Sequence, residues 1–471
     1  MITRENPARP DEIVGSVRST SPREVSEAVD AAREAHRNWA SVRVTGRADA
    51  LTAALHPLDS LLDDLSVLLA QESGKPRPDC RGELGFAVAY ARWLVGRSIP
   101  VLMDSEVDDE RGRLLTRHEP FGVIGAITPW NAPIILSMLK VAPALLAGNA
   151  IVVKPSPLAP LAVTALLGQL AQGLPAGLLQ VVNGGADTGA ALVSHPKVRK
   201  VAFTGGEVSG RAIAHLAAER LMPSVMELGG NDPAILLDDA LLSDEAMDRL
   251  VMASFATSGQ VCMAAKRLYV HASRYDELLE AYLAAADRVL VTGDPLDAGV
   301  TVGPLVTRAS ADRVTELLNE GTVHRLGETR ELGDGYFVQP ALVTGVDDAA
   351  PLVSQEQFGP AVPLLSFDHE DEVVARANSG ELGLAASVWS ADEDRAFTVG
   401  RRIEAGFVFI NTHNRTGMAL RAPFGGVKGS GYGREYGDEG LLEYTQTCMT
   451  HAPSAFRSGG AGSGAAAYPS G

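Results

Sequence analysis

The sequence predicts an α/β protein with more than one domain. The chain has 471 residues, which is too long for one compact core at roughly 150 residues per domain. From about residue 120, short apolar runs alternate with helical stretches, and this order indicates a parallel sheet with helical crossovers. A second mixture of apolar runs and helical stretches, from about residue 230 to 432, predicts a second α/β domain.

The individual elements follow in chain order. Ser21-Pro22-Arg23-Glu24 forms a capping box with proline at the first helical position, so a helix is expected to begin there. In the first domain we expect strands at 151–153, 179–182, 201–203 and 225–226, with helices at 161–172, 188–194 and 209–219. In the second domain we expect strands at 233–237, 267–270 and 407–410, with helices at 274–290 and 309–320. A parallel sheet of this kind binds dinucleotides at the carboxyl ends of its strands.

Composition excludes several classes of partner. Lys and Arg total 41 against 58 Asp and Glu, and a net charge of −17 would repel a nucleic acid backbone. The start MITRENPARP lacks a secretory signal, and prolines and polar residues interrupt the apolar region 122–153, so no membrane partner is expected. Cys80, Cys262 and Cys448 are too few for a disulfide framework and fit a cytoplasmic protein. The sequence contains no Cys/His cluster that indicates a metal site.

Three residues are suited to carbonyl chemistry. Cys262 follows Gly259-Gln260-Val261, although a lone cysteine in such apolar surroundings is more often an inert core residue. Glu227 precedes two glycines at the end of a predicted strand, where it could act as a general base or be an ordinary loop acid. Asn131 lies in a turn stiffened by prolines, and its amide could stabilise an oxyanion or simply belong to a rigid turn.

A fourth segment is suited to phosphate. Phe203-Thr204-Gly205-Gly206 ends a predicted strand and opens a helix, where free backbone amides and the helix dipole attract anions. The segment lacks the spacing GxGxxG, so by itself it is weak evidence for a dinucleotide.

Together these segments resemble the aldehyde dehydrogenase superfamily, in consistent order from about residue 10 to about residue 450. The family pattern GQxCxAxxR matches Gly259 to Arg267, and ELGG matches Glu227 to Gly230. The closing pattern PFGGxKxSGxGRE matches Pro423 to Glu435.

The resemblance implies an aldehyde dehydrogenase-like fold with three parts. Residues 1–99 and 120–229 would form a Rossmann-like cofactor domain, and residues 230–432 a catalytic domain. Residues 100–119 and 442–453 would form a small β element for assembly into a homodimer or homotetramer, because a partner can cover unpaired strand edges. Residues 458–471, almost entirely Gly, Ala and Ser, are expected to form a flexible tail.

The resemblance also implies an NAD(P)⁺-dependent oxidoreductase that converts an aldehyde to a carboxylic acid. Cys262 would attack the aldehyde, while the Asn131 amide and the Cys262 N–H stabilise the oxyanion. Hydride would pass from the thiohemiacetal to the nicotinamide, and Glu227 would activate a water that hydrolyses the thioester. Members of the family that transfer the acyl group to coenzyme A typically lack this glutamate, so a free acid is the expected product.

The remaining residues carried over from the resemblance concern the cofactor and the substrate. Lys154 matches the lysine at the adenosine ribose, and Glu356 and Phe358 match residues at the nicotinamide ribose and ring. The full cofactor set comprises Thr128, Trp130, Lys154, Ser156, Gly185, Gly189, Thr204, Gly205, Gly206, Glu356 and Phe358. The substrate-tunnel set comprises Leu136, Leu139, Val261, Met263 and Phe424, and Asn411 matches a further tunnel position.

Two departures from the family pattern concern the cofactor. Many NAD⁺-preferring members carry an acidic residue where this chain has Pro157, so weak discrimination or some use of NADP⁺ is expected, although NAD⁺ is the commoner family cofactor. Gly206 stands where the family usually has a serine at the pyrophosphate, so binding is expected to weaken but not to vanish.

Three alternatives to this interpretation remain open. Arg415 and Arg421 precede the closing motif and could hold the carboxylate of a semialdehyde substrate, or could belong to a solvated loop. A cysteine enzyme could use Cys262 and Glu227 for thioester or ester chemistry without redox turnover. The fold could also serve as a binding or structural protein.

Overall fold

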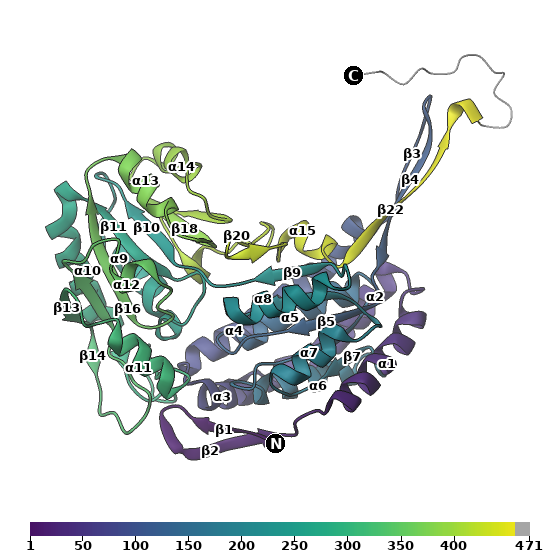
Figure 1. Cartoon of the computed structure of the whole chain (residues 1–471), viewed down its shortest axis with the longest axis horizontal. Coiled ribbons are helices and arrows are strands. Elements are labelled where there is room, and N and C mark those ends of the chain that lie inside the picture. Colours follow the sequence, from purple (N-terminus) through teal and green to yellow (C-terminus); the bar gives the residue numbers. More distant parts are fainter. Residues whose placement is uncertain (457–471) are drawn as a thin grey trace.

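Three β-sheets organise the chain in the computed structural model, which describes residues 1–456 (Figure 1). The first has six strands in the order β21-β9-β8-β5-β6-β7, and the second has seven in the order β13-β15-β16-β11-β10-β18-β19. The third is a three-stranded sheet, β22-β4-β3, that extends away from the body of the molecule. The predicted α/β class with parallel sheets is confirmed, and the predicted 458–471 tail lies outside the described residues.

The first sheet consists of five parallel strands and one short antiparallel strand. The parallel strands are β5 (Val123–Ile127), β6 (Ala150–Lys154), β7 (Leu179–Val181), β8 (Val198–Thr204) and β9 (Ser224–Glu227). The antiparallel strand β21 (Gly431–Tyr432) pairs with β9. The connecting helices are α5 (Pro133–Leu146), α6 (Leu161–Gln172), α7 (Ala186–Ser194) and α8 (Glu207–Ala218). Every residue of β5 and β6 is buried, as expected when helices cover both faces of a parallel sheet.

The N-terminal part adds a hairpin and four helices to this sheet. The hairpin pairs β1 (Ile2–Asn6) with β2 (Arg9–Val17). Helix α1 (Pro22–Trp39) begins as predicted, with the Ser21 side chain accepting from the Glu24 amide. The sequence analysis assigned no elements to the region of α2 (Val44–Leu55), the 3₁₀ turn His56–Leu61, α3 (Leu62–Ser73) and α4 (Arg77–Leu102).

Two buried glutamates from these helices hold the start of α5 and α6. Glu83 Oε1 accepts from the amides of Ile134 and Ile135, at 2.8 and 3.1 Å. Glu72 accepts from the amides of Leu161 and Ala162, both at 2.8 Å. Carboxylates suit helix N-termini because the free amides there carry partial positive charge. The two glutamates therefore fix the loops that follow β5 and β6.

The second sheet contains the remaining parallel strands. Its strands are β10 (Asp232–Leu236), β11 (Ala265–His271), β13 (Thr322–Arg325), β15 (Ala341–Thr344), β16 (Ala361–Phe367), β18 (Ala385–Trp389) and β19 (Phe407–Ile410). Its helices are α9 (Asp244–Phe255), α10 (Tyr275–Val289), α11 (Arg308–Glu316), α12 (Pro351–Ser354), α13 (Glu370–Asn378) and α14 (Glu393–Gly400). The helix predicted at 309–320 is shorter than expected, because the chain leaves the helix before Gly321, whose φ is +74°.

Short pairings connect the larger parts. They are β12 (Val291–Thr292) with β14 (Glu328–Thr329), and β17 (Leu382–Gly383) with β20 (Val427–Lys428). Helix α15 (Gly437–Leu442) precedes the last strand. Within residues 1–456, no helix is long and apolar enough to cross a membrane.

The third sheet is formed by β3 (Ser105–Asp109), β4 (Gly112–Pro120) and β22 (Thr445–Pro453). Strand β22 pairs antiparallel with β4 along its whole length. The predicted segment for this sheet began at residue 100. The hairpin of β3 and β4 begins at Ser105 instead, because α4 continues through Pro100 to Leu102. All five residues of β3 are exposed.

Candidate active site

A cavity of about 580 Å³ lies at the carboxyl ends of the strands of the first sheet. Parallel sheets bind ligands at this edge, and the volume is in the range of small-molecule and cofactor sites. All eleven residues of the predicted cofactor set line the cavity, and so do Pro157, Asn131 and Cys262. The residues therefore fit a dinucleotide in number, position and available space.

One part of the cavity wall carries a buried cation. Lys154 ends β6, and its Nζ donates to the carbonyl oxygens of Pro155 and Gly184, at 3.1 and 3.0 Å. Burial lowers the pKa of this lysine to about 8. Both of its hydrogen-bond partners are neutral, so its charge is available to polar or anionic groups of a ligand. A side chain at Gly206 would extend into open space, so the departure from serine leaves the backbone amides at the start of α8 accessible.

Another part of the wall brings together three further predicted cofactor residues. The rings of Trp130 and Phe358 meet edge to face, with centroids 5.5 Å apart. Glu356 Oε1 accepts from the Gly230 amide at 3.0 Å, and burial raises the pKa of Glu356 to about 7. Phe358 has a φ of +47°, a conformation that costs energy in a non-glycine residue and recurs at functional sites.

The loop that carries Cys262 lies against Asn131. Asn131 Nδ2 donates to the carbonyl oxygen of Gln260 at 3.0 Å, which holds the amide two residues from the thiol. Just upstream, Thr257 and Ser258 both have a φ of +57°, so this loop is also strained. The structure thus brings the predicted nucleophile and the predicted oxyanion donor to one wall of the cavity.

The environment of Cys262 favours the neutral thiol. Part of the residue is accessible from the cavity, yet the protein packed around its sulfur raises the pKa of the thiol far above its usual value. The carboxylates of Glu227, Asp232 and Glu356 raise it further, because they oppose a second negative charge. Formation of the reactive thiolate therefore requires removal of a proton during turnover.

Glu227 lies at the end of β9, next to the cavity but not among its lining residues. Its side chain is only 4% exposed, and within residues 1–456 its Oε1 has no hydrogen-bond partner. Burial raises the pKa of Glu227 well above its usual range, Glu435 adds to this rise, and Lys140 and Arg434 oppose it. Burial and Glu435 thus both disfavour the charged carboxylate, and one oxygen of Glu227 makes no hydrogen bond within the described residues.

A buried ion pair that the sequence analysis did not assign to the site supports this region. Lys140 donates to Glu435 at 2.6 Å and to the hydroxyl of Thr204 at 2.7 Å. Both charged side chains are buried. One sequence signal could have identified this pair. Lys140 is a lone lysine inside the apolar helix α5, and a charge in such a segment is rarely buried without a partner.

The predicted substrate-tunnel residues do not line this cavity. None of Leu136, Leu139, Val261, Met263 and Phe424 is among its lining residues. Leu136, Leu139, Met263 and Phe424 instead pack in the apolar cluster that also contains Cys262. In that cluster the ring of Phe407 lies 4.6 Å from that of Phe409 and 5.7 Å from that of Phe424, so three aromatic side chains are neighbours there.

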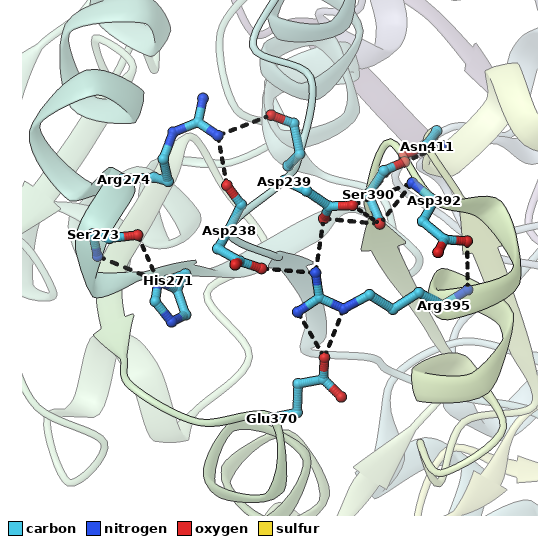
Figure 2. Close-up of polar contacts among 11 residues, drawn as sticks. Asp238, Asp239, His271, Ser273, Arg274, Glu370, Ser390, Asp392, Arg395 and Asn411 are labelled. Atoms are coloured by element: carbon cyan, nitrogen blue, oxygen red, sulfur yellow. Dashed lines mark hydrogen bonds and ion pairs between the residues drawn. The ribbon is translucent and has the colours of Figure 1, made fainter.

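Asn411, which was predicted to line the tunnel, is not among the residues that line the cavity. Figure 2 shows Asn411 beside Ser390 in a polar network of the second sheet. Its amide accepts from the Ser390 N–H and donates to the Ser390 carbonyl oxygen, both at 2.9 Å. Arg395 joins the same network through Asp238, Asp239 and Glu370. Asn411 therefore ties the end of β19 to the end of β18.

A cavity of this size at the carboxyl ends of a parallel sheet is typical of a dinucleotide-binding enzyme. The sequence model described as "Aldehyde dehydrogenase family" matches residues 1–450. The chain belongs to the aldehyde dehydrogenase family and is an NAD(P)-dependent aldehyde dehydrogenase.

Relatives extend over nearly the whole chain. The chain is 39% identical to geranial dehydrogenase of Castellaniella defragrans, over 93% of this chain and 92% of that enzyme. It is 38% identical to the NADP⁺-dependent succinate-semialdehyde dehydrogenase of Escherichia coli, over 94% and 93% of the two chains. The structure of a Mycobacterium tuberculosis aldehyde dehydrogenase complexed with NAD⁺ superposes with a TM-score of 0.90, at 34% identity over 97% of this chain and 95% of that one.

Proposed function

We propose that this site oxidises an aldehyde to a free carboxylic acid through a thioester on Cys262. The observation that carries the proposal is the Asn131 amide, held 3.0 Å from the Gln260 carbonyl beside the thiol and facing the cavity. When bound, NAD(P)⁺ supplies the acceptor for the hydride that leaves the substrate carbon. The test is aldehyde-dependent reduction of the cofactor by the purified protein, with one acid formed per cofactor reduced.

Each residue has a separate task in this proposal. The Cys262 sulfur bonds to the aldehyde carbon, and the Asn131 amide with the Cys262 N–H stabilises the negative oxygen that results. After oxidation, a water held by the free oxygen of Glu227 attacks the thioester, and Glu227 takes the proton. Lys154 and Glu356 would hold the two riboses of the cofactor, and the Gly205 and Gly206 amides its pyrophosphate.

We propose that the preferred substrates are neutral apolar aldehydes. Arg415, the candidate carboxylate ligand, is already paired with Asp79 at 2.8 Å. The charged groups that act most strongly on Cys262 are carboxylates, which would repel an anionic substrate. The aromatic cluster around Phe407 suits an apolar chain. The geranial relative supports this preference, whereas the semialdehyde relative keeps the carboxylate-bearing class as the competing outcome.

The expected result is a kcat/KM for a neutral aliphatic aldehyde at least ~10-fold above that for a carboxylate-ended aldehyde of the same length. The measurement is cofactor reduction with the matched pair at equal cofactor concentration. Arg415→Gln serves as a control, because it should leave the ratio unchanged if Arg415 takes no part in substrate binding. Equal turnover of both aldehydes would contradict the preference.

We also propose that the enzyme accepts both NAD⁺ and NADP⁺. Glu356 is the only carboxylate among the residues that line the cavity. Pro157 provides no negative charge against a 2′-phosphate, and the Lys154 cation has only neutral hydrogen-bond partners. We expect kcat/KM values for the two cofactors within ~10-fold of each other.

Substitution at position 157 tests the proposed basis of this tolerance. Pro157→Glu should lower kcat/KM for NADP⁺ by at least ~10-fold through like-charge repulsion, with a much smaller effect on NAD⁺. Pro157→Gln is the matched neutral control and should retain both activities. A strong NAD⁺ preference in the unsubstituted enzyme would show that other residues select the cofactor.

Finally, we propose a homodimer or homotetramer joined through the third sheet. Strands β3 and β22 form its two outer edges, and Val107 and Met449 on them are 50% and 55% exposed. Open edges of this kind favour pairing with another chain. Sedimentation velocity at assay concentration should give an oligomer, and replacing both Val107 and Met449 with lysine should weaken it. A monomer would refute this proposal. We likewise propose that residues 1–99 and 120–229 form the cofactor domain and residues 230–432, which include Cys262, the catalytic domain, with Asn131 and Glu227 contributed by the former.

A further inference from the structure

A buried lysine lies between the two loops that meet at the cavity. Lys266 on β11 is 1% exposed, and its Nζ donates to the carbonyl oxygen of Gly359 at 2.7 Å. A Cβ built on Gly259 would lie 2.8 Å from the same Nζ, so the ammonium group also touches the backbone of the Cys262 loop. One cation thus contacts both the segment 259–262 and the segment 356–359.

Both segments carry groups that the proposed function uses. In the first, the Gln260 carbonyl binds the Asn131 amide upstream of Cys262. In the second, Glu356 binds the Gly230 amide and Phe358 packs on Trp130. The positive φ of Phe358 requires neighbouring contacts to maintain it. The hydrogen bond from Lys266 to Gly359 is one such contact, directly after Phe358.

The charge of Lys266 also acts on Glu356. Among the charged groups around Glu356, Lys266 from β11 and Arg313 from α11 lower its pKa, whereas Asp232 from β10 raises it. Glu356 and Asp232 are in turn the groups that favour the charged form of Lys266. Burial opposes the two carboxylates and outweighs them, so the pKa of Lys266 is lowered to about 7.

Burying a lysine ammonium group costs free energy, unless the charge makes favourable interactions in the folded protein. An apolar side chain of similar volume would fill the same space without the desolvation cost. Lys266 lies at the junction of the two loops, where its charge can interact with groups of both segments.

We propose that Lys266 is a positioning residue that holds the segment 356–359 against the Cys262 loop and keeps Glu356 in its carboxylate form for the cofactor. The inference rests on the proposed function, because the role of Glu356 at the nicotinamide ribose is part of that function. Lys266 itself touches neither the predicted nucleophile nor the cavity lining.

The experiment compares Lys266→Met and Lys266→Gln with the unsubstituted enzyme. Methionine removes the hydrogen bond and the charge, whereas glutamine can retain a donor to Gly359 without the charge. KM for NAD⁺ and kcat are measured across the neutral pH range. For Lys266→Met we expect KM for NAD⁺ to rise by at least ~10-fold at neutral pH, with a smaller change in kcat.

The pH profile separates positioning from general stability. Without Lys266, Glu356 loses a group that lowers its pKa, so its carboxylate forms only at higher pH. The fall in KM with rising pH should therefore move to higher pH in both variants, and Lys266→Gln should show a smaller loss of kcat than Lys266→Met. Lys200→Met is the matched control, because Lys200 is also buried, at 3% exposed, but pairs with Glu443 away from the cavity.

The outcomes are distinguishable. Unchanged KM and pH profile in folded Lys266→Met and Lys266→Gln would overturn the positioning role, and so would an equal effect of Lys200→Met. Failure of the unsubstituted enzyme to reduce cofactor would refute the proposed function instead. An unchanged KM for NAD⁺ in Glu356→Gln would refute the cofactor role of Glu356. Thermal melting of each variant establishes that it is folded.

Discussion

Aldehyde oxidation is expected to fall by at least ~10,000-fold in Cys262→Ala, because within residues 1–456 Cys262 is the one thiol in the cavity lining. The substitution removes one sulfur atom and leaves the Asn131 amide and the cofactor set in place. Cofactor affinity should therefore stay within ~3-fold of the unsubstituted enzyme. The measurements are steady-state cofactor reduction and a fluorescence titration with NAD⁺ on the same preparation.

The control for this variant is Cys448→Ala, since Cys448 lies on β22 in the third sheet, outside the cavity lining. It should retain full activity. Residual aldehyde oxidation in Cys262→Ala above ~1% of the original rate would contradict the covalent route. Loss of cofactor binding in the same variant would indicate instead that the cavity had been disturbed.

Glu227→Gln is expected to separate oxidation from hydrolysis. The amide has nearly the same shape but cannot take a proton from water, so the thioester should form and then persist. We expect a rapid burst of reduced cofactor of about one equivalent per site, followed by a steady rate ~100- to 1,000-fold below normal. Stopped-flow absorbance measures the burst, and intact-protein mass spectrometry detects the acyl group on Cys262.

The pH dependence provides a second readout for Glu227. Its pKa is raised well above the usual range, mainly by burial, so the carboxylate form that acts as a base is favoured at higher pH than for an ordinary glutamate. The steady rate should therefore rise with pH in the unsubstituted enzyme, as the base form appears, and this rise should be absent in Glu227→Gln. Glu443→Gln, at a glutamate paired with Lys200, should behave like the unsubstituted enzyme. A normal steady rate in Glu227→Gln would exclude the general-base role.

The sequence predicted the elements that have a local signal. In the first sheet, β6 to β9 and the helices α6 to α8 were predicted close to their observed places, because strands buried on both faces form apolar runs that differ from the helical stretches between them. Strand β5 and helix α5 were not predicted. Helix α4 has no comparable signal. Its buried residues Leu84, Ala87, Val88 and Ala91 form one stripe, but Phe86, Val95 and Ile99 outside the buried set are apolar too, so the sequence does not distinguish the buried face.

The sequence likewise identified some residues of the candidate site and missed others. The cofactor residues were predicted because they lie in short motifs at strand ends, where topology brings them to one edge. Lys140, Glu435 and Lys266 could not be assigned, because their roles depend on contacts between residues far apart in the sequence. The two hydrogen bonds of Asn411 to Ser390 could not be predicted either, because a match in sequence identifies a position but not the partners of its side chain.

The pairing of β21 with β9 has a consequence for translation. Gly431 lies opposite Glu227 in this pairing, and Glu435 follows to meet Lys140. The strand that carries the proposed base is therefore an open edge until the last tenth of the chain has left the ribosome. Cys262 is synthesised well before Gly431, so the nascent protein holds its thiol for about a third of elongation without a completed site. A chain truncated before Gly431 would keep the thiol and the cavity residues but lack the partner strand of β9 and the Glu435 carboxylate.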